Sequence, residues 1–122
     1  MSVHLQRIRV THTTSRQSDA GTDDRVDLTQ VLQALGDAQC NDVLVEAGPT
    51  LGARFVELGL ADELIVYIAP VLLGPQARAM FEMPPLERLA DRLQFRLHRS
   101  ETVGDDLKLV LRPQARISDA ST

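Results

Sequence analysis

The sequence predicts an α/β fold with a mixed, mostly parallel sheet that closes with a C-terminal antiparallel hairpin. Two strand-like segments, 41–48 and 62–70, flank a helical pattern at 49–59. A strand, a helix and a second strand in this order imply a right-handed parallel crossover. Near the end of the chain, two segments with alternating apolar residues, 93–101 and 106–112, are separated by a Gly-Asp turn signal. This turn signal between two alternating segments predicts an antiparallel hairpin.

Length and composition indicate one domain, which we expect over residues 1–113, followed by a disordered tail at 114–122. The 122 residues are 43% hydrophobic and carry a net charge of -4, which is the wrong sign for binding a phosphate backbone. The single cysteine, Cys40, excludes an internal disulfide and a multi-cysteine metal site. No apolar run approaches the roughly 20 residues of a membrane span, and the N-terminus is too polar for a signal peptide. We therefore expect a cytoplasmic protein without a metal or nucleic-acid partner.

The first half of the chain alternates between strand and helix signals. Residues 3–10 alternate apolar and polar side chains with one irregularity in phase, which predicts a half-buried strand. The polar segment 11–24 predicts a surface loop. A helix is expected to begin at Asp27, whose carboxylate can cap it, and to end at Gly36. Its apolar face would comprise Leu28, Val31, Leu32 and Leu35.

The second half contains the strand expected to be central. Residues 62–70 form a near-continuous apolar run rich in β-branched residues, as in a strand covered on both faces. The helix before it would end at Gly59. The proline-rich segment 71–91 predicts a long connection with one helical turn around 77–81. Six residues of the hairpin are expected to point inward: Leu93, Phe95, Leu97, Leu107, Leu109 and Leu111.

The stretch VLVEAGPTLG, residues 43–52, is the strongest candidate site. Glu46 ends an apolar strand, where a buried carboxylate costs free energy unless it is paired. Gly48 allows a tight turn and close approach of another group, Pro49 suits the first helical position, and Thr50 can cap the helix. A helix start at the carboxyl end of a strand attracts anions. The alternative is an ordinary strand-to-helix turn with Glu46 paired to an arginine, because neither dinucleotide nor P-loop fingerprint is present.

Other polar residues carry weaker signals. His4, His12 and His98 lack the spacing of metal ligands, and Cys40 has no neighbouring histidine to activate it. Arg78 can bind an anion, although a solvated loop arginine is commoner. The acidic pairs Asp23–Asp24 and Asp105–Asp106 lie in expected turns, where carboxylates usually cap or solvate.

Residues 43–81 resemble the C-terminal reductase domain of the bacterial bifunctional riboflavin-biosynthesis deaminase-reductase. The motifs that carry the resemblance are Glu-x-Gly-Pro-Thr, Leu-Ala-Asp-Glu-Leu, Ala-Pro before Leu-Leu-Gly, and Gly-Asp-Asp-Leu. RVDLTQVLQALG upstream and LERLAD and LKLVLRP downstream follow the same order. The resemblance therefore covers residues 25–113.

This resemblance implies a dihydrofolate-reductase-like fold and NADPH-dependent reduction of a pyrimidine ribosylamino phosphate, the 5-amino-6-(5-phosphoribosylamino)uracil reductase step of riboflavin biosynthesis. By position, Glu46 would face the substrate, and no catalytic residue is assigned. Family members often have Gly where Ala47 stands and Lys where Val71 stands. The residues expected along NADPH are Gly48, Pro49, Thr50, Leu51, Gly52, Ala53 and Arg54.

The sequence departs from the family in length. The family's first strand and further strand-helix units have no counterpart here, and the zinc signature of the deaminase half is absent. We therefore expect a partial, N-terminally truncated reductase domain with an exposed sheet edge and apolar surface, which either forms a homodimer or folds poorly. The alternative hypothesis is a non-catalytic fragment or dimerisation module that lacks the substrate-binding N-terminal half.

Overall fold

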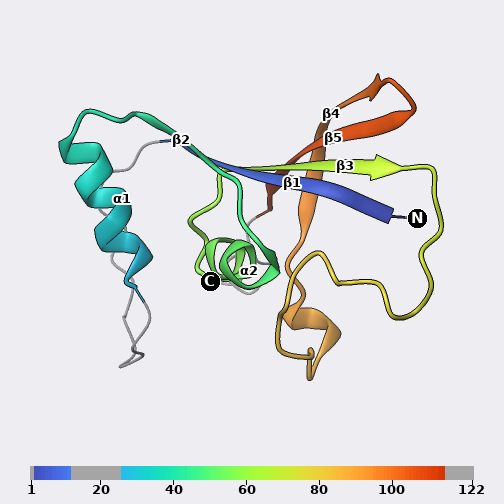
Figure 1. The fold of residues 1–122 in the computed structure, drawn as a ribbon. Helices are drawn as coiled ribbons and strands as arrows, with labels where there is room; N and C mark the ends of the chain where they lie inside the picture. Colours follow the sequence, from blue (N-terminus) through green and yellow to red (C-terminus); the bar gives the residue numbers. More distant parts are fainter. Residues whose placement is uncertain (1, 12–25, 115–122) are drawn as a thin grey trace.

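The structure, a computed structural model, describes residues 2–11, for which only the backbone is considered, and residues 26–114. It contains one five-stranded sheet, with strand order β2-β1-β3-β5-β4 (Figure 1). The elements are β1 Ser2–Thr11, α1 Leu28–Asp37, β2 Asp42–Val45, α2 Pro49–Glu57, β3 Glu63–Ala69, the 3-10 helix η1 Leu89–Asp91, β4 Phe95–Val103 and β5 Asp106–Pro113. The predicted tail at 114–122 lies, apart from Gln114, outside the described residues.

The prediction of a mostly parallel sheet is wrong. Among the described strands, β1 pairs antiparallel with both β2 and β3, and β5 pairs antiparallel with both β3 and β4. Strands β2 and β3 do run in the same direction, as a strand-helix-strand unit requires, but β1 lies between them and supplies the hydrogen bonds. The crossover through α2 therefore skips one strand position.

Strand β3 is the centre of the sheet, as its apolar run predicts. Leu64 and Val66 are 2% and 4% exposed, and their partners on β5 are Leu111 and Leu109. The intervening residues Ile65 and Tyr67 are half-buried on the opposite face. The pairing with β1 also contains a register shift between Val3 and Leu5, an irregularity of the kind expected from the sequence.

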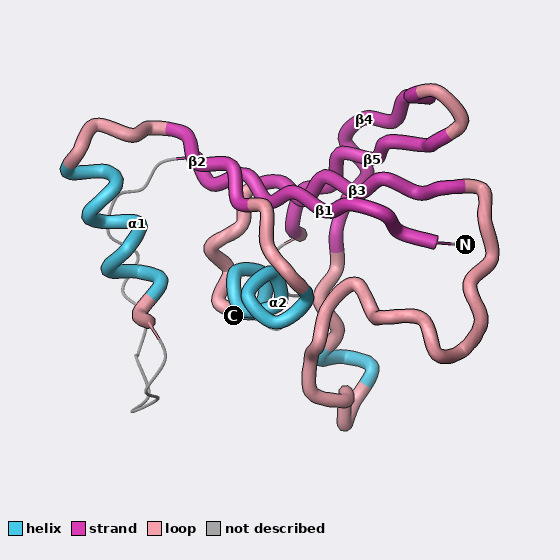
Figure 2. The backbone as a smooth tube through the Cα atoms, viewed as in Figure 1, coloured by secondary structure: helices cyan, strands magenta, loops and turns pink. Residues whose placement is uncertain are grey.

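The core forms where α2 packs against one face of the sheet, with α1 beside it toward β2 (Figure 2). Eight buried residues make up this cluster: Leu28, Leu32, Phe55, Val56, Leu60, Ala61, Leu64 and Val66. The predicted apolar face of α1 is confirmed for Leu28 and Leu32, which are both buried. Val31, at 39% exposed, lies at the margin of that face.

Helix α1 begins as predicted and ends later than predicted. The Asp27 carboxylate accepts hydrogen bonds from the backbone N–H groups of Thr29 and Gln30, at 2.9 and 3.3 Å. The prediction that Gly36 ends the helix is wrong, because Gly36 lies inside the last turn and α1 continues to Asp37. The left-handed residue that closes the helix is Gln39, with φ of 66°.

Both helices end in the same backbone arrangement. After α2, the N–H of Leu60 donates to the Phe55 carbonyl, and the N–H of Gly59 donates to the Val56 carbonyl. Cys40 and Gln39 make the equivalent bonds after α1. This is a Schellman motif, in which the residue after the cap takes a left-handed conformation. Gly59, with φ of 67°, adopts the left-handed conformation without strain. In Gln39 the Cβ makes the same conformation unfavourable.

The C-terminal hairpin forms where predicted, around Gly104 with φ of 60°, which suits the first central residue of a type II′ turn. Two of the residues expected to point inward do not. Leu97 is 56% and Leu107 is 41% exposed, whereas Val110 is 4% exposed. A register shift between Leu97 and Arg99 interrupts the alternation of β4, which lies at the edge of the sheet.

The connection between β3 and β4 lacks the helical turn expected around 77–81. Its described turns are a hydrogen bond from the Ala77 N–H to the Gly74 carbonyl and the short helix η1. The segment is held instead by a tertiary contact, in which the N–H of Glu82 donates to the Pro49 carbonyl at 3.2 Å. That contact draws the chain toward α2 rather than into a local helix.

Replacing Gln39 with glycine is expected to raise the free energy of unfolding by about 0.5–1 kcal/mol, because glycine adopts the left-handed conformation without strain from a Cβ. Urea denaturation of Gln39→Gly beside the parent chain measures the change. The matched variant Gly59→Ala places a Cβ on the equivalent residue after α2 and is expected to lower stability by about 1 kcal/mol. A destabilised Gln39→Gly would contradict the helix-end assignment.

Candidate functional site

Glu46 follows the last residue of β2 and is exposed rather than buried. The prediction that Glu46 is buried at a desolvation cost is therefore wrong, because β2 is an outer strand of the sheet. Burial along β2 alternates, and Leu44 is 52% exposed despite the apolar appearance of the sequence. The carboxylate lies at the surface, two residues before the helix start at Gly48.

The start of α2 is open to the surface. Gly48 is the N-terminal cap, with φ of -72° and ψ of 179°, and contributes no side-chain hydrogen bond; Pro49 occupies the first turn as predicted. A Cβ added at Gly48 would meet no atom within 4 Å. Thr50 does not cap the helix, contrary to expectation, because it lies inside the first turn. The surface over the helix start is therefore accessible to a ligand.

Helical periodicity divides the predicted run of site residues into two groups. Thr50 and Leu51 are exposed, whereas Gly52 and Ala53 are buried against the core. Ala53 is only 2% exposed. A ligand on the helix start can therefore reach the first turn from outside but not the side chain of Ala53.

Arg54 lies at the far end of the predicted run and has a structural partner. Its Nη2 atom donates to the backbone carbonyl of Val26 at 2.8 Å. Val26 precedes α1, so this bond joins α2 to the beginning of the other helix. The bond is exposed, but its donor is charged and it joins segments 28 residues apart, which makes it a stabilising contact between the two helices.

Glu82 is a site residue that the sequence did not reveal. Its Oε2 atom accepts a hydrogen bond from the Thr50 hydroxyl at 3.0 Å, and its backbone N–H is bonded to Pro49. The two elements are separated by 32 residues, so no local pattern could have indicated the pairing. A carboxylate beside a helix N-terminus is electrostatically favourable. An anionic ligand at the same place would have to compete with it.

The weaker candidates that the structure describes lie on different elements. Cys40 is half-buried at the end of α1, and His98 and Arg78 are exposed on β4 and in the connection after β3. Asp105 lies in the hairpin turn. In the residues described, no three His, Cys, Asp or Glu side chains gather as metal ligands. His12, Asp23 and Asp24 lie outside these residues, and His4 lies on β1.

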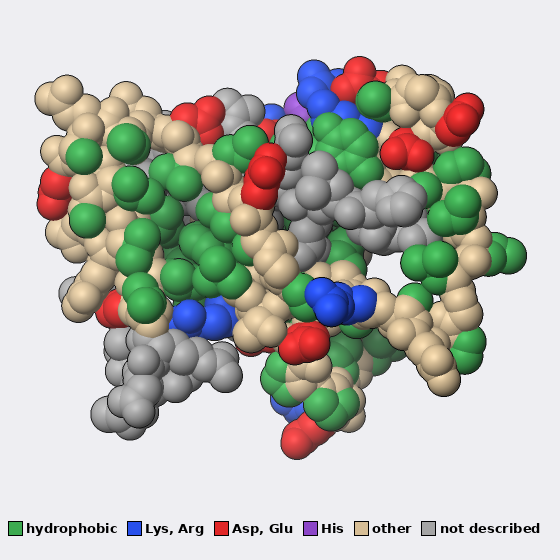
Figure 3. All heavy atoms as spheres, in the orientation of Figure 1, with side chains coloured by type: hydrophobic (Ala, Val, Ile, Leu, Met, Phe, Trp, Pro, Cys, Tyr) green, Lys and Arg blue, Asp and Glu red, His purple; other side chains and the backbone are tan. Residues whose placement is uncertain are grey.

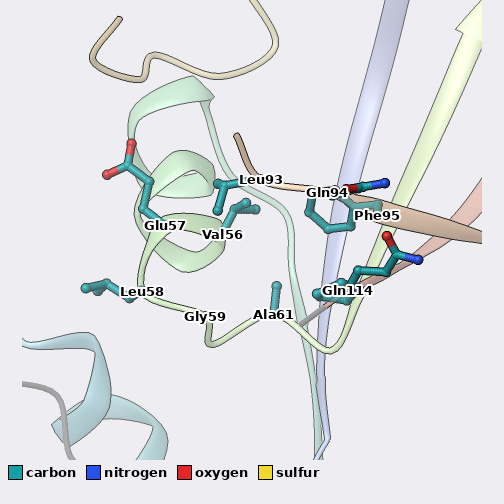
Figure 4. Close-up of a pocket in the computed structure, with 10 residues that line it drawn as sticks. Val56, Glu57, Leu58, Gly59, Ala61, Leu93, Gln94, Phe95 and Gln114 are labelled. Atoms are coloured by element: carbon teal, nitrogen blue, oxygen red, sulfur yellow. The ribbon is translucent and has the colours of Figure 1, made fainter. Parts of the chain in front are cut away.

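A separate pocket of about 470 Å³ lies at the opposite end of α2 (Figure 4). Its walls include Val56 and Ala61 on one side and Leu93 and Phe95 on the other. None of the predicted site residues lines it. Among the described helices, none is long and apolar enough to span a bilayer.

Comparison with known proteins decides the family. The RibD C-terminal domain matches residues 2–109. The chain belongs to this family. RibD, the riboflavin biosynthesis protein of Escherichia coli K12, is 49% identical over 86 residues, which cover 70% of this chain and 23% of that protein. The chain thus spans about a quarter of the length of this relative.

Shorter relatives and solved structures agree with the assignment. The 5-amino-6-(5-phosphoribosylamino)uracil reductase of Buchnera aphidicola (Acyrthosiphon pisum) is 32% identical over 90 residues, which cover 74% of this chain and 44% of that protein. The structure of RibD from Acinetobacter baumannii, form 2, superposes with a TM-score of 0.69 at 42% identity, over 74% of this chain and 25% of that one. The α/β fold with its antiparallel sheet is therefore shared with RibD.

Replacing Arg54 with methionine is expected to lower the free energy of unfolding by about 1 kcal/mol, because the bond to the Val26 carbonyl is lost. Urea denaturation checks the change. The matched variant Arg88→Met removes an exposed arginine whose ion-pair partner among the described residues is nearby Asp91, and it should change stability by less than about 0.5 kcal/mol. Equal stability of the two variants would remove the structural role of Arg54.

Proposed function

We propose that the chain provides the cofactor-side part of a 5-amino-6-(5-phosphoribosylamino)uracil reductase in riboflavin biosynthesis, with NADPH as cofactor. The observation that carries the proposal is the open start of α2 in a member of the RibD C-terminal domain family. Because the chain spans about a quarter of RibD, the activity of the whole relative is assigned here as a proposal. A dihydrofolate-reductase-like fold is part of the same proposal.

The first turn of α2 fits a phosphate group. Gly48 has no side chain that could cap the helix. Among the described residues, the backbone N–H groups of Thr50 and Leu51 therefore receive no hydrogen-bond acceptor from the cap residue. These donors and the positive end of the helix dipole favour an anion. Bound NADPH would present its phosphates there, and its nicotinamide would supply the hydride. Gly48 allows close approach because nothing surrounds its missing Cβ.

Glu46 is suited to hold the pyrimidine or ribosyl part of the substrate. It is exposed at the end of β2 and lies two residues from the helix cap. A carboxylate accepts hydrogen bonds from ring N–H and hydroxyl groups, which are the donors that such a substrate presents. The chain therefore holds substrate and cofactor sites next to each other, an arrangement that supplies proximity and orientation.

The competing hypothesis is the non-catalytic fragment or dimerisation module. Binding of NADPH separates the two, because the module has no need of a cofactor. The homodimer and the cytoplasmic location remain predictions from the sequence.

Replacing Gly48 with aspartate is expected to weaken NADPH binding at least tenfold, since a carboxylate then lies where a phosphate is proposed to bind. Titration followed by NADPH fluorescence gives the dissociation constant. Gln33→Glu adds the same charge to the exposed face of α1 and should leave the affinity within twofold. Glu46→Gln should do so too, because Glu46 is assigned to the substrate. Absence of NADPH binding to the parent chain at millimolar concentration would favour the non-catalytic module.

Replacing Glu82 with glutamine is expected to tighten NADPH binding about two- to fivefold. The change removes a negative charge beside the proposed phosphate position, which corresponds to roughly 0.5–1 kcal/mol. The same fluorescence titration measures it, with Glu87→Gln as a control for loss of an exposed carboxylate from the same connection. Weaker binding in Glu82→Gln would show that the carboxylate helps to hold the cofactor rather than opposing it.

A further inference from the structure

Two arginines face each other across the C-terminal hairpin. Arg96 on β4 and Arg112 on β5 are directly opposite in the antiparallel register. Side chains at such positions share one face of the sheet, and like charges there are destabilising. A pair of cations in this arrangement calls for a negative partner.

Within the described residues, one carboxylate supplies that negative charge to one of the two arginines. The Nε atom of Arg112 lies 3.2 Å from Oε2 of Glu63, and the two side chains are 54% and 12% exposed. For Arg96, no carboxylate partner is found among the described residues. His98, two residues along β4, adds a further nitrogen donor to the same region. Among the described residues, Glu63 therefore contacts one of the two guanidinium groups, and no carboxylate contacts the other.

These side chains line a hollow of suitable size. Arg96, His98 and Arg112 surround a pocket of about 480 Å³, and Leu97, Pro113 and Gln114 complete its wall. Small-molecule sites have volumes of roughly 300–1,000 Å³ and combine apolar walls with a few polar groups. In Figure 3, basic, histidine and acidic side chains lie together over β4 and β5.

The hollow is separate from the proposed cofactor site. The register places Val45, at the end of β2, opposite Ile8, which in turn lies opposite Leu64 near the start of β3, so Glu46 is not at a strand end far from Glu63. The separation is across the sheet instead, because β2 is one outer strand and β4 is the other. Strands β1 and β3 lie between β2 and β5, which puts Arg112 and Arg96 roughly 14 and 19 Å from Glu46 at about 4.8 Å per strand.

We propose that this hollow binds the phosphate group of a small phosphorylated molecule, such as a sugar phosphate. Guanidinium groups bind phosphate through paired N–H donors, and a phosphate monoester carries enough charge for both arginines. Leu97 and Pro113 offer apolar contact to the organic part, and the Gln114 amide offers hydrogen bonds to its hydroxyl groups. This second site does not depend on the proposed reductase function.

Calorimetric titration of the full chain with ribose 5-phosphate, at constant ionic strength, tests the proposal. Saturable binding at or below millimolar concentration is expected, with no heat from ribose. Arg96→Gln should weaken binding at least tenfold, whereas Arg88→Gln, which removes the same charge far from the hollow, should change it less than twofold. Thermal unfolding without ligand provides a fold control: Arg96→Gln should be as stable as the parent or more so, because a like-charge contact is relieved.

Three results would overturn the proposal: no binding of ribose 5-phosphate at 10 mM, equal affinities in Arg96→Gln and Arg88→Gln, or complete displacement by NADPH. The last would place the phosphate at the start of α2. NADPH binding is measured separately on the same protein, so failure of the reductase proposal leaves this result readable. Ribose 5-phosphate binding that persists in Gly48→Asp and is lost in Arg96→Gln would support the second site.

Discussion

The arrangement of this protein depends on the backbone pairing of β1 with two strands at once. Residues 2–11 bond to β2 along one edge and to β3 along the other. Without that strand, β2 and β3 would have no common partner within the described sheet, because the crossover through α2 spans two strand positions. The position of β1 between β2 and β3 fixes the place of α2 on the sheet, and with it the positions of Glu46 and of the start of α2.

Burial then decides which parts of α2 can serve a ligand. The helix packs through Ala53, Phe55 and Val56 into the core, so only its first turn and outer face remain accessible. The same helix is held by polar contacts at both ends of its exposed surface, to Glu82 near the start and to Val26 farther along. The surface proposed for binding is thus built on an element that is fixed from three directions, which would limit the cost of ordering it on binding.

The sheet also separates charge between its two edges. Beyond the outer strand β2, the Glu82 carboxylate contacts the first turn of α2. On the opposite side of the sheet, Arg112 pairs with Glu63, and Arg96 has no carboxylate partner among the described residues. The rigid strands between the edges keep these groups apart. One small domain can therefore present two anion-attracting regions of different chemistry, one formed by backbone donors and one by side chains.

The sequence by itself determined the five strands and the two α-helices, the central position of β3, the Asp27 cap, the hairpin turn at Gly104 and the family. These features follow from local patterns and motif order. Tertiary structure decided the rest. Strand direction depended on a partner distant in the chain, β1. Exposure of Glu46 followed from the edge position of β2. Gln39 rather than Gly36 takes the left-handed position at the helix end, because the closing bonds to the Gly36 and Leu35 carbonyls come from the N–H groups of Gln39 and Cys40. The Glu82 and Arg96–Arg112 contacts joined residues that no sequence period connects.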